Sequence, residues 1–197
     1  MEELTEYIAF DLEFNTVNDR TDIIQVSAVK FKEHTEIAQF DTYVYTDMPL
    51  KSFINGLTGI TSDKINTAPK IDKVLNDFSN FIGKRPLIGY NAVKSDLPLL
   101  EEKGLKLFEQ YAVDVFDEAY ERRSMELNGI ANLKLHTVAQ FLGFDGKSHN
   151  SLEDARMTAK VYESFLESDS NKALLNQQEG VLNNPFAGLN LTGLFDD

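Results

Sequence analysis

A short apolar segment near the N-terminus carries two carboxylates, and this combination limits what the chain can fold into. Residues 7–13 read YIAFDLE, which is typical of a buried β-strand. Side chains two residues apart lie on the same face of a strand, so Asp11 and Glu13 point the same way. Burying unpaired carboxylates is costly, so this pair requires a partner. The acid-x-acid pattern alone is weak, because about five chance occurrences are expected in so acidic a chain.

Two later motifs add side chains of the same kind. Asp96 follows the apolar run 86–90 and precedes a helical segment, whereas Asp154 lies in the first turn of a predicted helix, with His149 on the loop before it. Clustered carboxylates repel one another without a metal, and Mg²⁺ and Mn²⁺ prefer oxygen ligands. The pattern therefore predicts a two-metal site that cleaves phosphodiester bonds. His149 is the candidate base that takes the proton from the attacking water.

Each member of this set has another interpretation when it is considered alone. Asp154 fits a capping box that begins at Ser151, and a less close match begins at Asn150. Asp96 could cap the helix that follows it. A single histidine such as His149 is more often a surface or core residue than a base. The hypothesis therefore depends on the joint pattern.

Taken together, the motifs resemble those of the DEDD exonuclease superfamily, in its His-containing branch, which includes the proofreading epsilon subunit of bacterial DNA polymerase III. The first two motifs are IAFDLE at 8–13 and LIGYNAVKSDLPLL at 87–100. The third comprises KL at 134–135, VA at 138–139, LGF at 142–144 and SHNSLEDA at 148–155. The connector LTGIT at 57–61 is also common in the family. The resemblance covers about residues 5–167.

This resemblance implies a fold, a ligand set and a reaction. The implied fold is α/β and ribonuclease-H-like, with a mixed five-stranded sheet flanked by helices. Asp11, Glu13, Asp96 and Asp154 would bind two Mg²⁺ or Mn²⁺ ions, and His149 would be the general base. The implied reaction is hydrolysis from a 3′ end that releases nucleoside 5′-monophosphates.

Two departures from the family pattern affect the expected substrate contacts. Many relatives follow the first glutamate with Thr-Thr-Gly, whereas this chain has Phe14 and Thr16 around an asparagine. We expect this segment to meet the terminal nucleotide, where Phe14 either stacks on a base or belongs to the core. Asn91, a further candidate substrate contact, lies five residues before Asp96 instead of the commoner four, so we expect a one-residue bulge.

The net charge of −13 argues against a protein that coats nucleic acid, because such proteins usually have a basic footprint. It does not exclude an enzyme that holds a few terminal nucleotides, since bound metals offset local negative charge. Lys94, Lys147 and Arg156 lie near the motifs and either contact phosphates or are solvated surface charges. We expect weak, salt-sensitive binding of substrate.

The composition sets the expected compartment. The chain has no Cys, which excludes disulfides and thiolate zinc sites. Its acidic N-terminus is unlike a signal peptide, and no apolar stretch approaches the length of a membrane span. We therefore expect a cytoplasmic protein without membrane association.

The elements can be placed from periodicity and turn residues. We expect strands over 7–13, 22–32, 36–45, 86–90 and 111–115, and helices over 70–82, 97–103, 117–126, 133–142 and 152–166. Early hairpins followed by helical crossovers imply a mixed sheet covered by helices.

We expect one exonuclease domain over residues 1–167 and a C-terminal tail over 168–197, where Asn, Gly and Ser become frequent. Residues 190–195, NLTGLF, loosely resemble the sliding-clamp-binding peptide of bacterial replication proteins, with Leu191, Leu194 and Phe195 as apolar contacts. The same side chains could instead cover part of the domain's own core. A DNA polymerase is the other expected protein partner.

The leading hypothesis is a metal-dependent 3′–5′ exonuclease that acts on single-stranded or frayed DNA ends. An RNA-trimming or short-oligonucleotide hydrolase is the alternative among enzymes, because nothing in the sequence clearly reads a 2′-hydroxyl. A non-catalytic module that tethers replication factors through its tail is the alternative from a different class.

Overall fold

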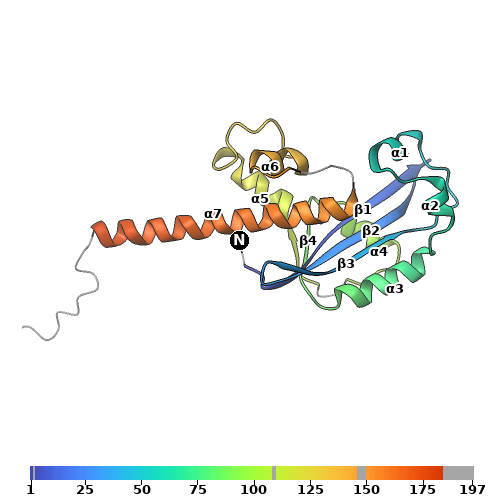
Figure 1. The fold of residues 1–197 in the computed structure, drawn as a ribbon, viewed down its shortest axis with the longest axis horizontal. Coiled ribbons are helices and arrows are strands. Elements are labelled where there is room, and N and C mark those ends of the chain that lie inside the picture. Colours follow the sequence, from blue (N-terminus) through green and yellow to red (C-terminus); the bar gives the residue numbers. More distant parts are fainter. Residues whose placement is uncertain (2, 108–109, 146–149, 184–197) are drawn as a thin grey trace, which may run out of the picture.

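The computed structural model describes residues 1, 3–107, 110–145 and 150–183 (Figure 1). The strands are β1 (Glu6–Val17), β2 (Arg20–Lys32), β3 (Thr35–Tyr43), β4 (Leu87–Gly89) and β5 (Ala112–Asp114). The helices are α1 (Ser52–Thr58), α2 (Ser62–Asn66), α3 (Ile71–Ile82), α4 (Asp96–Glu102), α5 (Val115–Glu121), the 3₁₀-helix η1 (Arg122–Ser124), α6 (Leu135–Phe141) and α7 (Ser151–Asn183). Among these residues, no helix combines the length and apolar character needed to cross a bilayer.

One mixed sheet of five strands runs in the order β3-β2-β1-β4-β5. β1, β2 and β3 are antiparallel, whereas β4 and β5 run parallel to β1. Two-residue turns close the two hairpins, and all four turn residues have positive φ: Asn18, Asp19, Glu33 and His34. Such turns match the twist of the flanking strands. The predicted α/β fold with a mixed five-stranded sheet flanked by helices is confirmed.

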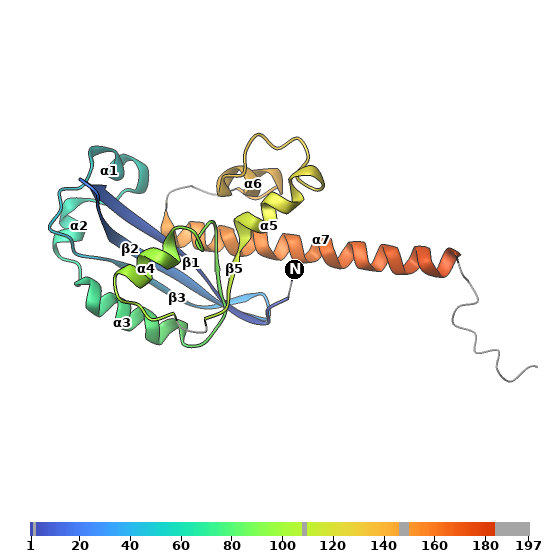
Figure 2. The same cartoon turned by 180° about the vertical axis from the view of Figure 1, so that it is seen from behind.

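The alternation of side chains along β1 separates the two layers of the core. Tyr7 and Ala9 lie in one cluster with the residues of α7, whereas Ile8, Phe10 and Leu12 lie in another with α3 and α4. Helices therefore cover both faces of the sheet (Figure 2). Because side chains alternate along the strand, the face of β1 that packs on α7 also carries Asp11 and Glu13.

Helices α1 and α2 occupy a stretch for which the sequence showed no periodic pattern. Both are short, and each contributes one buried apolar side chain to a small cluster. Its buried members are Ile24, Ile54, Ile60 and Ile65. A helix of five or seven residues leaves too few turns to display a period of 3.6.

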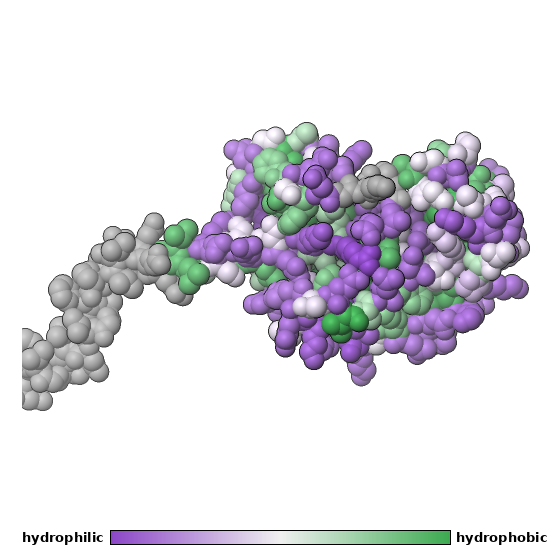
Figure 3. All heavy atoms as spheres, viewed as in Figure 1, coloured by the Kyte–Doolittle hydropathy of each residue, from purple (hydrophilic) through white to green (hydrophobic). Residues whose placement is uncertain are grey.

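Helix α7 is longer than expected. It continues from Ser151 to Asn183, whereas the sequence predicted an end near Leu166. The added segment contains good helix formers such as Ala, Leu, Gln, Glu and Lys and no proline. This end of the helix projects from the body of the molecule, and its Leu174 and Leu175 are exposed (Figures 1 and 3). The helix crosses the proposed boundary at residue 167, and the division into domain and tail remains a prediction.

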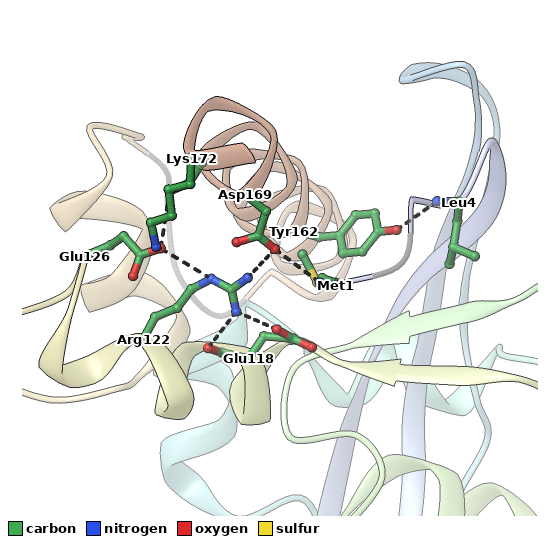
Figure 4. A network of polar contacts seen from close by, with 9 residues as sticks. Met1, Leu4, Glu118, Arg122, Glu126, Tyr162, Asp169 and Lys172 are labelled. Carbon is green, nitrogen blue, oxygen red and sulfur yellow. Dashed lines mark hydrogen bonds and ion pairs between the residues drawn. The ribbon is translucent and has the colours of Figure 1, made fainter. Parts of the chain in front are cut away.

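A buried network of charges ties the middle of α7 to α5 and η1 (Figure 4). The Arg122 side chain is 7% exposed and donates from Nη2 to Asp169 of α7 at 2.7 Å. It also pairs with Glu118 of α5 and lies 3.9 Å from Glu126, which in turn accepts from Lys172. These contacts therefore fix the position of α7 relative to α5 and η1.

Candidate metal centre

The central strand and the longest helix bring three carboxylates together. One carboxylate oxygen from each of Asp11, Glu13 and Asp154 lies within 4.8 Å of the other two. The first two share a face of β1, and the third stands in the first turn of α7, which packs on that face. Residues separated by as many as 143 positions in the chain thus form one group of carboxylate oxygens.

Asp96 completes the set from the start of α4. Its side chain is buried, and its Oδ1 accepts a hydrogen bond from the backbone N–H of Leu12 at 3.2 Å. Its other carboxylate oxygen accepts from Ser95. The carboxylate therefore lies against β1 beside the two acids of that strand. Three of the four predicted acids thus form one group, and Asp96 lies beside it. That these four residues bind metal remains a prediction.

The start of α7 is fixed on the strand by its first side chains. Ser151 Oγ donates to the carbonyl of Asp11 at 2.8 Å, so it does not cap the helix. The capping oxygen is instead Oδ1 of Asn150, which accepts from the N–H of Glu153 at 3.1 Å. Of the two capping residues considered from the sequence, the structure therefore has Asn150 and not Ser151 as the side-chain cap. Asp154 is therefore not needed as a partner of a Ser151 cap.

Crowding raises the proton affinity of these carboxylates. The pKa of Asp11 is well above its usual range because of burial and the charges of Asp96, Glu13 and Asp154. Burial and two neighbouring carboxylates raise the pKa of Glu13 to about 7. Burial also raises the pKa of Asp96 to about 6, although hydrogen bonds partly oppose it. Among the described residues, no lysine, arginine or histidine forms an ion pair with Asp11, Glu13 or Asp96.

Carboxylates gathered in this way suit hard divalent cations. The charge repulsion that raises their pKa values is relieved when a cation with a preference for oxygen ligands binds between them. The donor set of Asp11, Glu13, Asp96 and Asp154 consists only of oxygen, as Mg²⁺ and Mn²⁺ prefer. The residues present therefore fit the metals that the sequence implied.

Asp114 is a residue that the sequence analysis missed. It ends β5 and is buried, and its Oδ1 and Oδ2 accept from the backbone N–H groups of Asn91 and Val93 at 2.7 and 3.1 Å. Asn91 has a left-handed φ of 57°, and the N–H of Leu97 reaches back five residues to Ala92. These features accommodate the bulge expected before Asp96. The position of Asp114, an acid between an apolar strand and a helix, is the sequence signal that could have identified it.

The segment after Glu13 presents an exposed ring. Phe14 is 45% exposed, so the alternative in which it belongs to the core is wrong. Asn15 is buried and donates to the Pro49 carbonyl at 3.1 Å, which holds the loop before α1. The hydroxyl of Thr16 lies 2.9 Å from that of Thr21 across the hairpin. Substrate contact by Phe14 and Thr16 remains a prediction.

Two of the three basic residues near the motifs are engaged in ion pairs. Arg156 pairs with Glu36 of β3 at 2.8 Å, and Lys94 pairs with Asp117 at 2.9 Å. The arginine thereby links α7 to the edge of the sheet. The third residue, Lys147, lies outside the described part of the chain.

The predicted base and the predicted clamp peptide also lie outside the described residues. They are His149, Leu191, Leu194 and Phe195. Their proposed roles depend on sequence alone.

Comparison with known proteins places the chain in a family. The sequence model of the exonuclease family (RNase_T) matches residues 8–162. "DNA polymerase III PolC-type" of Caldanaerobacter subterraneus subsp. tengcongensis is 33% identical over 168 residues, which cover 82% of this chain and 12% of that protein. The protein of the same name from Bacillus subtilis is 29% identical over 185 residues, covering 90% and 13%. The chain therefore spans about an eighth of the length of these relatives.

Solved structures of low sequence identity share the fold. The nuclease domain of 3′hExo, described as a DEDDh family member bound to rAMP, superposes with a TM-score of 0.67 at 21% identity, covering 84% of this chain and 93% of that one. The ExoI–ssDNA complex of E. coli gives 0.70 at 14% identity, covering 85% and 41%. The family match spans all three acidic motifs and most of the described fold. The chain therefore belongs to the exonuclease family and is a member of the DEDD exonuclease superfamily, as its motifs predicted.

Proposed function

We propose that this chain is a metal-dependent 3′–5′ exonuclease of the His-containing branch that hydrolyses single-stranded or frayed DNA ends to nucleoside 5′-monophosphates. The observation that carries the proposal is the convergence of Asp11, Glu13 and Asp154 within 4.8 Å, beside a buried Asp96. The carboxylates of such a cluster repel one another and destabilise the metal-free protein, whereas a divalent cation bound between them relieves the repulsion. Membership of the exonuclease family supports the reaction class.

The proposed roles of the acids follow from this arrangement, and that of His149 from the sequence motif alone. Asp11, Glu13, Asp96 and Asp154 would hold two Mg²⁺ or Mn²⁺ ions. When bound, such ions activate water and neutralise charge on the departing oxygen. His149 takes one proton from the water that attacks the terminal phosphorus. The bond from phosphorus to the 3′ oxygen of the preceding nucleotide breaks, and that oxygen takes up a proton from solvent, which leaves a 3′-hydroxyl and a free nucleoside 5′-monophosphate.

The names of the relatives support the choice of DNA over RNA as the substrate and of a polymerase as the partner. Both relatives compared above bear the name of a DNA polymerase, which favours DNA as the substrate and a polymerase as the partner that delivers it. Because the chain corresponds to only a small part of those proteins, an isolated enzyme should bind substrate weakly. The tail residues Leu191, Leu194 and Phe195 would contact a sliding clamp, and deletion of residues 185–197 should then abolish clamp binding.

The test uses 5′-end-labelled DNA and RNA oligonucleotides of the same sequence, with Mg²⁺, Mn²⁺ or EDTA. We expect products that shorten one nucleotide at a time from the 3′ end, faster on DNA and absent in EDTA. His149→Ala should lower turnover roughly 10²- to 10⁴-fold, as loss of a general base does. His34→Ala is the matched control, because His34 is half exposed in a hairpin turn. Wild-type turnover by His149→Ala would refute its role, and internal cleavage would refute the exonuclease.

A further inference from the structure

A cavity of about 590 Å³ borders the metal centre on the side of α5 and α6. Asp154 belongs both to its lining and to the carboxylate cluster. The other lining residues are Tyr90, Asn91, Phe116, Leu133, Lys134, Leu135, His136 and Thr137. They come from the loop after β4, the first turn of α5 and the start of α6. Figure 2 shows α5 and α6 on one side of the molecule and α1 and α2 on the other. The cavity therefore lies on the flank away from α1 and α2.

The lining of this cavity suits a flat aromatic ligand. The rings of Tyr90 and Phe116 lie 5.8 Å apart, with an angle of 85° between their planes. The Tyr90 hydroxyl donates to the Leu133 carbonyl at 2.7 Å, which fixes its ring. Leu133 and Leu135 add apolar surface. Aromatic side chains in such a setting stack on nucleobases of any sequence, because every base has a π-face.

The rim of the cavity supplies positive charge. Lys134 is exposed, and within the described part of the chain its Nζ takes no ion pair, in contrast to Lys94, which is paired with Asp117. His136 also lines the cavity and has no carboxylate partner among the described residues. In a chain with a net charge of −13, a lysine without an acidic partner beside the metal centre is suited to a phosphate.

The walls of the cavity are held in place by one buried carboxylate. Asp114 accepts from the N–H of Asn91, which lines the cavity, and from the N–H of Phe116 at 3.0 Å. It therefore fixes the loop after β4 and the first turn of α5 relative to each other. A cavity whose walls are fixed in advance loses less entropy when a ligand binds.

We propose that this cavity is a nucleobase subsite that takes the base of a nucleotide adjoining the scissile phosphate, with Phe116 and Tyr90 as its aromatic walls and Lys134 against the phosphate backbone. The inference rests on the proposed function, because it places a nucleic-acid strand across the carboxylate cluster. It adds a specific contact outside the segment 14–16. The base is that of either the terminal or the penultimate nucleotide, and the experiment distinguishes the two.

The first experiment compares the wild type, Phe116→Ala and Tyr120→Ala on three single-stranded oligonucleotides. One is intact, one lacks the terminal base and one lacks the penultimate base. Tyr120 is the matched control, because it lies on the same helix, is 63% exposed and does not line the cavity. Phe116→Ala should lower kcat/KM on the intact strand roughly 5- to 150-fold, mainly through KM, as loss of one stacked base does. Tyr120→Ala should match the wild type.

The abasic strands decide between the two positions. On the strand that lacks the base bound in the cavity, Phe116→Ala and the wild type should have equal kcat/KM. A gap that persists on both abasic strands, or no gap on the intact strand, would overturn the proposal. Phe116→Leu guards against misfolding, because it keeps apolar volume and loses the flat ring. It should show a smaller loss of the same sign with an unchanged melting temperature.

A binding measurement separates this inference from the proposed function. With Ca²⁺, an oligonucleotide carrying 2-aminopurine at the occupied position should change its fluorescence on binding to the wild type but not to Phe116→Leu. A wild type that shortens DNA but leaves this fluorescence unchanged would refute the subsite alone. A wild type that changes it without cleaving any strand would refute the exonuclease and keep the subsite.

Discussion

The carboxylates of β1 show how a single residue's environment sets its chemistry. Glu13 stands on a strand whose preceding residues are buried, and two further acids approach from other elements. Its pKa is raised to about 7 by the loss of water on burial and by the charges of Asp154 and Asp96. The same charge repulsion that raises these pKa values in the metal-free protein favours the binding of a divalent ion.

This raised pKa predicts how stability depends on pH in the metal-free protein. Because folded Glu13 holds its proton up to about pH 7, whereas its usual value is 4.5, the folded state binds more protons in between. The contribution of Glu13 to the free energy of unfolding should therefore fall as pH rises across this range, by roughly 3 kcal/mol at most, and level off above it. Metal binding needs deprotonated carboxylates, so stabilisation by Mn²⁺ should grow over the same range.

Urea denaturation in EDTA from pH 4.5 to 8 measures this effect. Glu13→Gln should remove part of the fall, because the amide does not titrate, whereas the raised pKa values of Asp11 and Asp96 leave the remainder. Retention of the full pH dependence by Glu13→Gln would show that other groups cause it.

At the scale of an element, α7 performs two tasks with different parts. Its first turn places Asp154 over β1, where Ser151 bonds the strand and Arg156 bonds β3. Its middle is anchored by the charges around Arg122. The position of Asp154, a proposed metal ligand, thus depends on contacts made along much of the helix, because a helix transmits a shift at one end to the other.

The anchor predicts an unequal response to two substitutions. Arg122→Met should destabilise the protein by roughly 3 kcal/mol, because it leaves Glu118 and Asp169 without their buried partner. Lys172→Met should cost less than about 1 kcal/mol, because that lysine is half exposed. Denaturant midpoints of the two variants measure the difference. Equal losses would show that the buried arginine is not the anchor.

At the scale of the whole molecule, net charge works against the proposed substrate. A chain of charge −13 repels a nucleic-acid strand at long range, while the cavity rim offers attraction at short range. The carboxylate cluster itself becomes attractive to phosphate only when metals are bound. Specific binding should therefore be local and should involve few phosphates.

This balance predicts weak binding with a shallow dependence on salt. The slope of log Kobs against log salt for a single strand should be between zero and about −2, because each phosphate contact contributes about −0.7. Lys134→Ala should bring the slope closer to zero by about 0.7, whereas Lys73→Ala on α3 should leave it unchanged. Fluorescence anisotropy in Ca²⁺ over a range of KCl measures both. Tight binding that ignores salt would contradict the prediction.

Much of the fold followed from local patterns because those patterns have local causes. The period of two in β1 and the period near 3.6 in α3 are each set by one buried face, and both elements appeared where expected. Helix α5 begins at Val115, two residues early, because the Asp114 side chain caps it. Helices α1 and α2 and the length of α7 were missed, since the first two are too short for periodicity and the last has no strong stop before Pro185.

The sequence by itself determined the ligand chemistry, because Asp11, Glu13, Asp96 and Asp154 occur in motifs whose residue types and order identify a superfamily. Only the tertiary structure decided which acids meet, that Asn150 caps α7, and that Asp114 fixes a cavity beside the metal centre. The reason is physical. Residue type sets what a side chain binds, whereas the distance between residues far apart in sequence is set by how the sheet and its helices pack.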